Sequence, residues 1–236
     1  MNFSLLCPSK DRPDLLYGLW KNLITSVNNP VETELLLKFD RGSGLPYPEM
    51  LSTWMKVFHG EHSDYLQRDY YNWLSEKASG KYLWGIGDDV RFETKHWDIL
   101  LQDKIEEYLQ DKPDRIAMIS VTEMGSTAKH PCFPLITREA FIATGMYFHP
   151  QLLSWGADRT IYELYSGVGR VLHVPEIEIR HLSYHDGTAV FDRTAESMRE
   201  RFFRNPNCHN EVSKDIIPNQ ILKLTEYINH ASSSNR

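Results

Sequence analysis

The chain has 236 residues and a mass of 27.6 kDa, which is the size of one large domain. Its hydrophobic residues (41%) are enough to bury a core, but no apolar run approaches the ~20 residues that a membrane-spanning helix needs. The net charge of −6 argues against broad electrostatic binding to nucleic acid. The three cysteines are widely spaced and predict neither a disulfide framework nor a zinc site. A reducing, cytoplasmic setting is therefore expected.

The first forty residues predict a strand, a helix and a second strand. The apolar run Phe3–Cys7 has the composition of a buried strand, and Pro8 ends it. Leucines at helical spacing predict a helix over Asp14–Ser26, and a second apolar run predicts a strand over Glu34–Phe39. This order of strand, helix and strand favours parallel pairing through a right-handed crossover.

Strands and helices continue to alternate along the rest of the chain, although Leu51–Phe58 fits a short helix or a strand equally well. Further strands are predicted at Lys81–Ile86 and Arg115–Val121, and a strand pair at Arg170–Pro175 with Glu178–His181. Helices are predicted at Asp69–Ala78, His96–Gln110, Thr137–Gly145, Ala157–Ser166, Thr194–Phe203 and Ile216–Asn229. We therefore predict an α/β fold with a mostly parallel central sheet flanked by helices, as a single domain over residues 1–230 with a disordered tail at 231–236.

Polar residues follow three of the predicted strands at the point where each strand ends. They are the loop PSKDR from Pro8 to Arg12, the pair Asp40-Arg41 and the pair Asp88-Asp89. Ligands of an open parallel sheet bind beyond the carboxyl ends of its strands, so these residues are candidates for one site. The carboxylates of Asp88 and Asp89 repel each other unless solvent or a cation relieves the repulsion. A solvated turn explains the pair as well as a Mg²⁺ or Mn²⁺ site does, in which carboxylates and substrate phosphates share the ion.

Three segments resemble those of one enzyme family in their order and spacing. The first segment, FSLLCPSKDRPDLL, is similar to the first strand and loop of family-2-like glycosyltransferases of the GT-A type. The second, NWLSEKASGKYLWGIGDDV, is similar to the helix and strand that carry the DXD-type motif of that family. The third, SWGADRTIYELY, is similar to the segment that begins a helix over the acceptor pocket. The resemblance covers most of residues 1–170. It implies a GT-A-like domain with a nucleotide-sugar-binding half at 1–122 and an acceptor-binding half at 123–230.

The resemblance also implies which residues hold the nucleotide-sugar. Pro8, Ser9 and Arg12 lie where the family's first loop touches the nucleotide, with Arg12 available to the diphosphate. Asp40 lies where a carboxylate meets the base, for example the imide N–H of a uracil. Asp88 would face the ribose or share the metal.

Metal and catalytic roles follow from the same resemblance. Asp89 would ligate Mn²⁺ or Mg²⁺ with His181 as a further ligand, and His185 competes with His181 for that role. The motif here is Gly-Asp-Asp-Val and not a spaced Asp-x-Asp, which leaves open which of the two aspartates holds the metal. Asp158 lies where inverting members keep their catalytic base, although Gly156-Ala157-Asp158 before an apolar run also fits a helix N-cap. Trp155 is a candidate for stacking against an acceptor ring.

These residues predict a metal-dependent glycosyltransferase that moves a sugar from a nucleotide-sugar, with a UDP-sugar favoured, to an acceptor hydroxyl with inversion of configuration. The acceptor could be a glycan, a small molecule or a hydroxymethylated DNA base. A nucleotidyltransferase of similar fold is an alternative, but the first loop lacks the glycines that such enzymes use around a triphosphate. A non-catalytic carbohydrate-binding relative is a third possibility.

Overall fold

A single mixed sheet organises the molecule, and its strand order is β3-β2-β1-β4-β7-β6-β8-β5. The structure is a computed structural model that describes residues 1–42, 50, 52–126, 128–152, 156–184, 187–204 and 208–234. One half of the sheet is parallel and consists of β3 (Met55–Gly60), β2 (Thr33–Asp40), β1 (Phe3–Pro8) and β4 (Tyr82–Gly85). The other half contains β7 (Leu135–Thr137), β6 (Met118–Met124), β8 (Val171–His181) and β5 (Val90–Phe92), in which only β6 and β8 run parallel. The predicted α/β fold with a mostly parallel sheet is confirmed.

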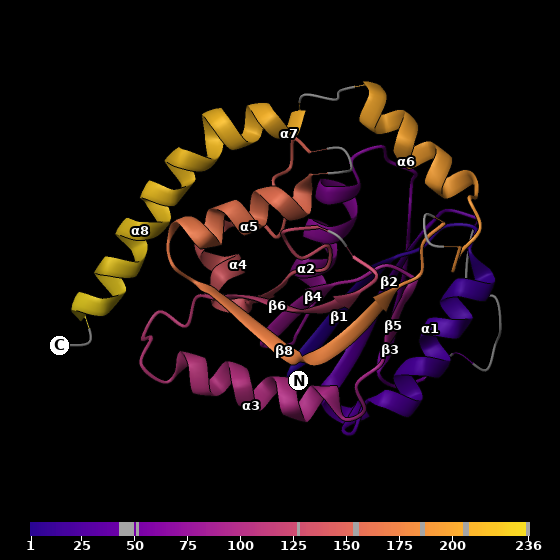
Figure 1. The fold of residues 1–236 in the computed structure, drawn as a ribbon, viewed down its shortest axis with the longest axis horizontal. Coiled ribbons are helices and arrows are strands. Elements are labelled where there is room, and N and C mark those ends of the chain that lie inside the picture. Colours follow the sequence, from indigo (N-terminus) through magenta and orange to yellow (C-terminus); the bar gives the residue numbers. More distant parts are fainter. Residues whose placement is uncertain are drawn as a thin grey trace.

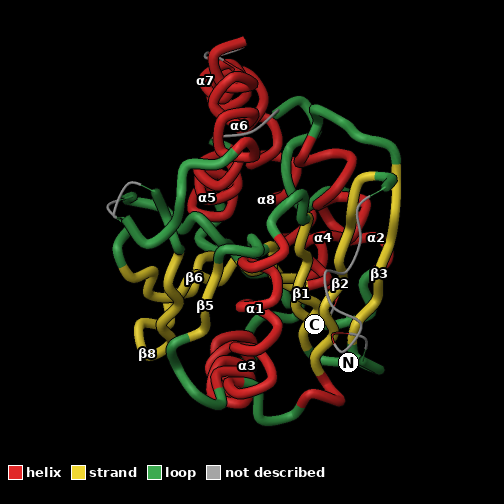
Figure 2. Tube along the Cα trace, turned by 90° about the vertical axis from the view of Figure 1, so that its right-hand side faces the viewer, coloured by secondary structure: helices red, strands yellow, loops and turns green. Residues whose placement is uncertain are grey.

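Two hydrophobic cores lie on opposite faces of this sheet. Successive side chains of a strand point to opposite faces, so Leu5 of β1 enters one core and Leu6 enters the other. The first core packs against α1 (Pro13–Ser26) and α3 (Trp97–Leu109). The second packs against α2 (Trp73–Lys77), α4 (Arg138–Thr144), α5 (Ala157–Gly167) and α8 (Ile217–Ser234). Helices therefore cover both faces of the sheet (Figures 1 and 2), and burial on both faces explains why the central strands are mainly apolar.

The C-terminal helices form an arc around the outside of this sandwich (Figure 1). The arc consists of α6 (Arg193–Arg204), α7 (Cys208–Glu211) and α8, with a π-helical turn at Val212–Ile216. A second π-helical turn, Gln67–Asn72, leads into α2, and a 3₁₀ turn, Pro30–Glu32, leads into β2. Helix α6 runs close to the carboxyl ends of the central strands, as its contacts below show.

Three predictions about individual elements were wrong or incomplete. The two segments predicted as a strand pair form one strand, β8, whose pairing with β6 jumps from Val174 to Glu178. Pro175 lies in that irregularity, as is usual for a residue without an N–H to donate. The ambiguous segment Leu51–Phe58 ends in strand β3. Residues 231–234, predicted as part of a disordered tail, continue helix α8 to Ser234.

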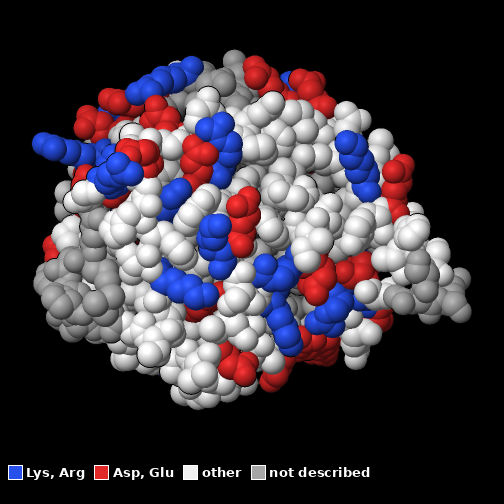
Figure 3. Space-filling model, turned by 180° about the vertical axis from the view of Figure 1, so that it is seen from behind, with Lys and Arg blue, Asp and Glu red and all other residues white. Residues whose placement is uncertain are grey.

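Charged side chains are distributed over the surface (Figure 3), and no helix among the described residues is long and apolar enough to cross a membrane. On the face shown in Figure 3, acidic and basic side chains are interspersed and form no large block of one sign. Cys7 is buried and free, and the half-buried Cys132 is also free.

Candidate active site

The first loop of the chain joins the carboxyl ends of β1, β2 and β4. Ser9 Oγ donates a 2.7 Å hydrogen bond to Asp88 Oδ2. Arg12 Nη1 lies 3.2 Å from Asp88 Oδ1 and 3.0 Å from Asp89 Oδ2. Lys10 Nζ lies 3.2 Å from Asp40 Oδ2. Because β2, β1 and β4 are neighbours in the sheet, the predicted donor-binding residues meet at one edge, where Pro8 ends β1.

Asp88 and Asp89 form a buried acidic pair with different surroundings. The side chains of Asp88 and Asp89 are only 4% and 15% exposed. Burial and then the adjacent charge of Asp89 raise the pKa of Asp88 to about 7. Burial also acts to raise the pKa of Asp89, but the hydrogen bond and charge of His181 and the charge of Arg12 outweigh it and lower that pKa. Asp89 is thus the member of the pair that stays ionised.

Gly87 and Arg91 shape the turn that carries Asp88 and Asp89. A Cβ atom at Gly87 would collide with Oδ1 of Asp89, so a larger residue there would force that carboxylate to move. Arg91 Nη1 donates to the carbonyl oxygens of Asp88 (3.1 Å) and Val90 (2.7 Å), and its Nη2 donates to the carbonyl of Leu15 (3.0 Å). The acidic turn is therefore tied to the first helix, and Gly-Asp-Asp is a structural unit.

His181 ends β8 beside Asp89. In the sheet it pairs with Val90 of β5, and its Nε2 lies 3.6 Å from Asp89 Oδ2. Burial lowers the pKa of His181, but the hydrogen bond and charge of Asp89 outweigh burial, and the net change is an increase. His185, the competing candidate, lies outside the described residues.

The side chains around Asp89 could supply part of the ligand set of a metal ion, with the rest supplied by a substrate and water, but not a complete set of protein ligands. Among the residues that the structure describes, no group of three or more His, Cys, Asp or Glu side chains could hold a metal ion. Two ligands at about 2.1 Å from one ion can lie up to about 4.2 Å apart, and the 3.6 Å between Asp89 and His181 satisfies this. Mg²⁺ sites commonly take one or two carboxylates and complete the shell with substrate phosphates and water. Asp89 and His181 would likewise supply only two ligands and leave the other positions of the metal to substrate and water.

Asp40 lies at the end of β2 in a network of its own. Its Oδ1 accepts a hydrogen bond from the Tyr70 hydroxyl, and its Oδ2 contacts His62 Nδ1 at 2.8 Å as well as Lys10. Burial acts to raise the pKa of Asp40, but the bonds from Tyr70, His62 and Lys10 outweigh it and lower that pKa. Asp40 is therefore an ionised, buried carboxylate held rigidly next to the first loop.

Asp192 connects the first loop to α6. Its carboxylate accepts two hydrogen bonds from Arg12, one from Nε at 2.7 Å and one from Nη2 at 3.0 Å, and its Oδ1 also caps α6 by accepting from the N–H of Ala195. Thr194 Oγ1 donates to the carbonyl of Lys10 at 3.1 Å. These contacts were not predictable from the sequence, because Asp192 lies among alternating arginines and acidic residues that resemble a solvated helix face.

Asp158 lies at the start of α5 and contacts a second histidine. The N-cap of α5 is Gly156, in the left-handed region with φ of 92°, so the interpretation of Asp158 as the N-cap is wrong. Asp158 Oδ1 accepts from the N–H of Arg159 at 2.9 Å, and its Oδ2 lies 3.4 Å from His130 Nε2. Trp155, the candidate for stacking, lies outside the described residues.

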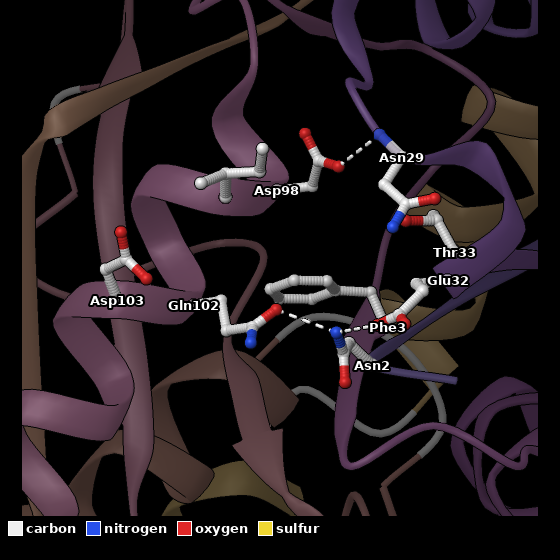
Figure 4. A pocket seen from close by; sticks show the side chains of 9 residues that line it. Asn2, Phe3, Asn29, Glu32, Thr33, Asp98, Gln102 and Asp103 are labelled. Atoms are coloured by element: carbon white, nitrogen blue, oxygen red, sulfur yellow. Dashed lines mark hydrogen bonds between the residues drawn. The ribbon is translucent and has the colours of Figure 1, made fainter.

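A separate hollow of about 220 Å³ lies away from this chemistry (Figure 4). Its lining includes Asn2 before β1 and Thr33 at the start of β2, so it lies at the amino ends of the strands. Asp98 accepts hydrogen bonds there from the N–H groups of Asn28 and Asn29, both at 2.8 Å. The hollow therefore lies where the start of α3 meets the amino ends of the strands.

The architecture matches solved structures over nearly its full length. GalNAc-T7 with UDP, GalNAc and Mn²⁺ aligns with 97% of this chain at a TM-score of 0.61 and 14% identity, and 55% of that protein is covered. S. aureus TarS aligns with 97% of the chain at 0.59 and 14%, and the mannosyltransferase PcManGT from Pyrobaculum calidifontis, in complex with GDP-Man and Mn²⁺, aligns with 98% at 0.59 and 12%.

The chain has the GT-A fold. It spans 43% of the TarS chain and 75% of PcManGT, so it corresponds to only a part of these proteins. No family model and no curated protein matches the sequence. The GT-A fold is thus established through structure at identities too low for a sequence match.

Proposed function

We propose that this protein is a metal-dependent glycosyltransferase that moves a sugar from a nucleotide-sugar, with a UDP-sugar favoured, to an acceptor hydroxyl with inversion. The observation that carries the proposal is the meeting of Ser9, Arg12, Asp88 and Asp89 at one edge of a GT-A sheet. The compared structures that hold UDP, UDP-GlcNAc or GDP-Man share this fold.

The donor would lie along the first loop. Asp40 is the group that we propose for the base, and Arg12 is the cation that we propose for the diphosphate. Arg12 is 14% exposed and already bridges three carboxylates, so its guanidinium is fixed in place before a ligand arrives. A diphosphate would compete with Asp192 for the same N–H groups.

Sugar transfer requires neutralisation of the leaving nucleoside diphosphate. Asp89 and His181 are the proposed ligands of Mn²⁺ or Mg²⁺, which when bound supplies Lewis-acid stabilisation of phosphate charge. Arg12 adds a fixed positive charge on the same side of the site. On the acceptor side, Asp158 supplies the negative charge that lets the acceptor hydroxyl lose its proton as it attacks the anomeric carbon.

The proposal is tested by measuring nucleoside diphosphate release from a panel that includes UDP-N-acetylglucosamine, UDP-glucose and GDP-mannose, with Mn²⁺, Mg²⁺ or EDTA. We expect release from a uridine donor with water or an added sugar as acceptor, and its loss in EDTA. Release of pyrophosphate from nucleoside triphosphates, with no use of any nucleotide-sugar, would instead support nucleotidyl transfer. Absence of turnover and of nucleotide binding across the panel would contradict an enzymatic role.

A further inference from the structure

The carboxylate of Asp158 is held between a backbone N–H and a histidine. Oδ1 accepts from the N–H of Arg159, and Oδ2 faces Nε2 of His130 at 3.4 Å. Both side chains are 25% exposed, so the pair is sheltered but open on one side. The second ring nitrogen of His130, Nδ1, has no hydrogen-bond partner among the residues that the structure describes. The acceptor atom that this pair offers to a ligand is therefore Nδ1 of His130.

The loop that carries His130 is fixed at its C-terminal end. The carboxylate of Glu123 accepts from the N–H groups of Cys132 (2.9 Å) and Phe133 (3.0 Å). The Trp84 indole donates to the carbonyl of Phe133 at 2.9 Å, and the Tyr147 hydroxyl donates to that of Pro134. Four hydrogen bonds with three side chains hold residues 132–134, which restricts where His130 can lie.

The same loop connects His130 to the acidic rim. The ring of Phe133 packs edge-on against the ring of His181, with centroids 4.9 Å apart, and its Cε1 is 3.7 Å from the position of a Cβ on Gly87. The charge of Glu123 acts on both His130 and His181. Phe133 therefore connects the loop that carries His130 to His181, the histidine beside Asp89.

We propose that His130 is the group that takes the acceptor's proton and that Asp158 acts through it as a positioning residue. This inference rests on the proposed function and names the atom for one of its steps. The acceptor oxygen forms a bond to the anomeric carbon, and its proton passes to Nδ1 of His130. The bond from the anomeric carbon to the phosphate oxygen breaks, and its electron pair leaves with the nucleoside diphosphate.

The charges around His130 favour this division of roles. The hydrogen bond to Asp158 is the largest influence on the pKa of His130 and raises it above 6.5, with Glu123 adding in the same direction and burial and Arg159 opposing. A general base works best when its pKa lies near the working pH, and a histidine next to a carboxylate meets that condition better than a carboxylate next to a histidine. In such a pair the carboxylate fixes the tautomer and orientation of the ring.

The test compares wild type with His130→Gln, His130→Ala and Asp158→Asn. Glutamine keeps an amide N–H near the place of Nε2 but removes the basic Nδ1. His59→Gln, which replaces an exposed histidine of β3, is the matched control. Each variant is assayed for UDP release from the accepted donor, for UDP affinity with Mn²⁺, and for its melting temperature.

We expect His130→Gln to lower kcat by about 10²–10⁴-fold, with UDP affinity and melting temperature near wild type. Imidazole added to His130→Ala should restore part of the rate, which a merely structural histidine would not allow. The wild-type rate should rise with pH as His130 loses its proton. Because Asp158 raises the pKa of His130, Asp158→Asn should move that rise to lower pH.

Two negative results are distinguishable. If wild type releases UDP and His130→Gln does so at the same rate, the assignment of His130 is wrong and the proposed function stands. If wild type neither binds a nucleotide nor turns over any donor, the proposed function fails and the assignment of His130 fails with it.

Discussion

Arg12 neutralises three carboxylates, and its removal should destabilise the fold. The guanidinium makes contacts of 2.7 to 3.2 Å with Asp88, Asp89 and Asp192. Arg12→Met keeps most of the side-chain volume but leaves two buried carboxylates facing each other without this cation. Breaking a buried ion pair by removing one partner costs about 3–5 kcal/mol. Protonation of Asp88, whose pKa is already raised to about 7, limits the loss at neutral pH to about 3 kcal/mol.

In a chain of this length, about 3 kcal/mol lowers the melting temperature by roughly 6–12 °C. The matched control is Arg204→Met, because Arg204 pairs with Asp64 at 3.2 Å but is 62% exposed, and such a pair is worth about 0–1 kcal/mol. The double variant Arg12→Met/Asp88→Asn should melt above Arg12→Met, since it removes one of the two repelling charges. Differential scanning calorimetry measures all four proteins. Equal melting temperatures for Arg12→Met and Arg204→Met would refute the reasoning.

Two further substitutions test other parts of the account. Glu34 is fully buried and accepts from Ser4 and Ser79 beside Lys56, so Glu34→Gln should cost about 1–3 kcal/mol at pH 7 in urea unfolding. Burial acts to raise the pKa of Glu34, but these bonds outweigh it and lower that pKa below 4.5. The stabilisation is therefore present at neutral pH, and the difference in unfolding free energy between variant and wild type should shrink as the pH falls below 4.5. A difference that stays constant with pH would contradict this. Gly87→Ala should displace the Asp89 carboxylate and weaken Mn²⁺-dependent UDP binding at least about tenfold by calorimetry, and unchanged affinity would show that the turn tolerates a side chain.

The central strands and the polar residues that follow them were predictable because both are visible as short patterns of neighbouring residues in the sequence. Strands β1, β2 and β4 are buried on both faces, so each is mainly apolar, and each reaches a polar residue within three positions of its end. The order of such strands in a parallel sheet then brings Ser9, Arg12 and Asp88 to one edge. The three-residue strands β5 and β7 are too short for a periodic pattern, and sequence inspection missed both.

The partners of the site residues were not predictable, since they are distant in sequence. Asp192 lies 180 residues from Arg12, and His130 lies 28 residues before Asp158. His62 contacts Asp40 across 22 residues, with no spacing rule that links them. Alternation of charges made Asp192 look like an ordinary surface residue, whereas its carboxylate holds Arg12 and caps a helix. Only the three-dimensional fold shows these pairings.

The central claim is that Asp89 and His181 share a divalent cation with a nucleoside diphosphate. The most direct test is a titration of Mn²⁺ followed by electron paramagnetic resonance, with UDP present or absent, for wild type and Asp89→Ala. We expect wild type to bind Mn²⁺ tightly only when UDP is present and Asp89→Ala to lose that binding while still unfolding in a single cooperative transition. Equal binding of Mn²⁺ and UDP by the two proteins would contradict the claim.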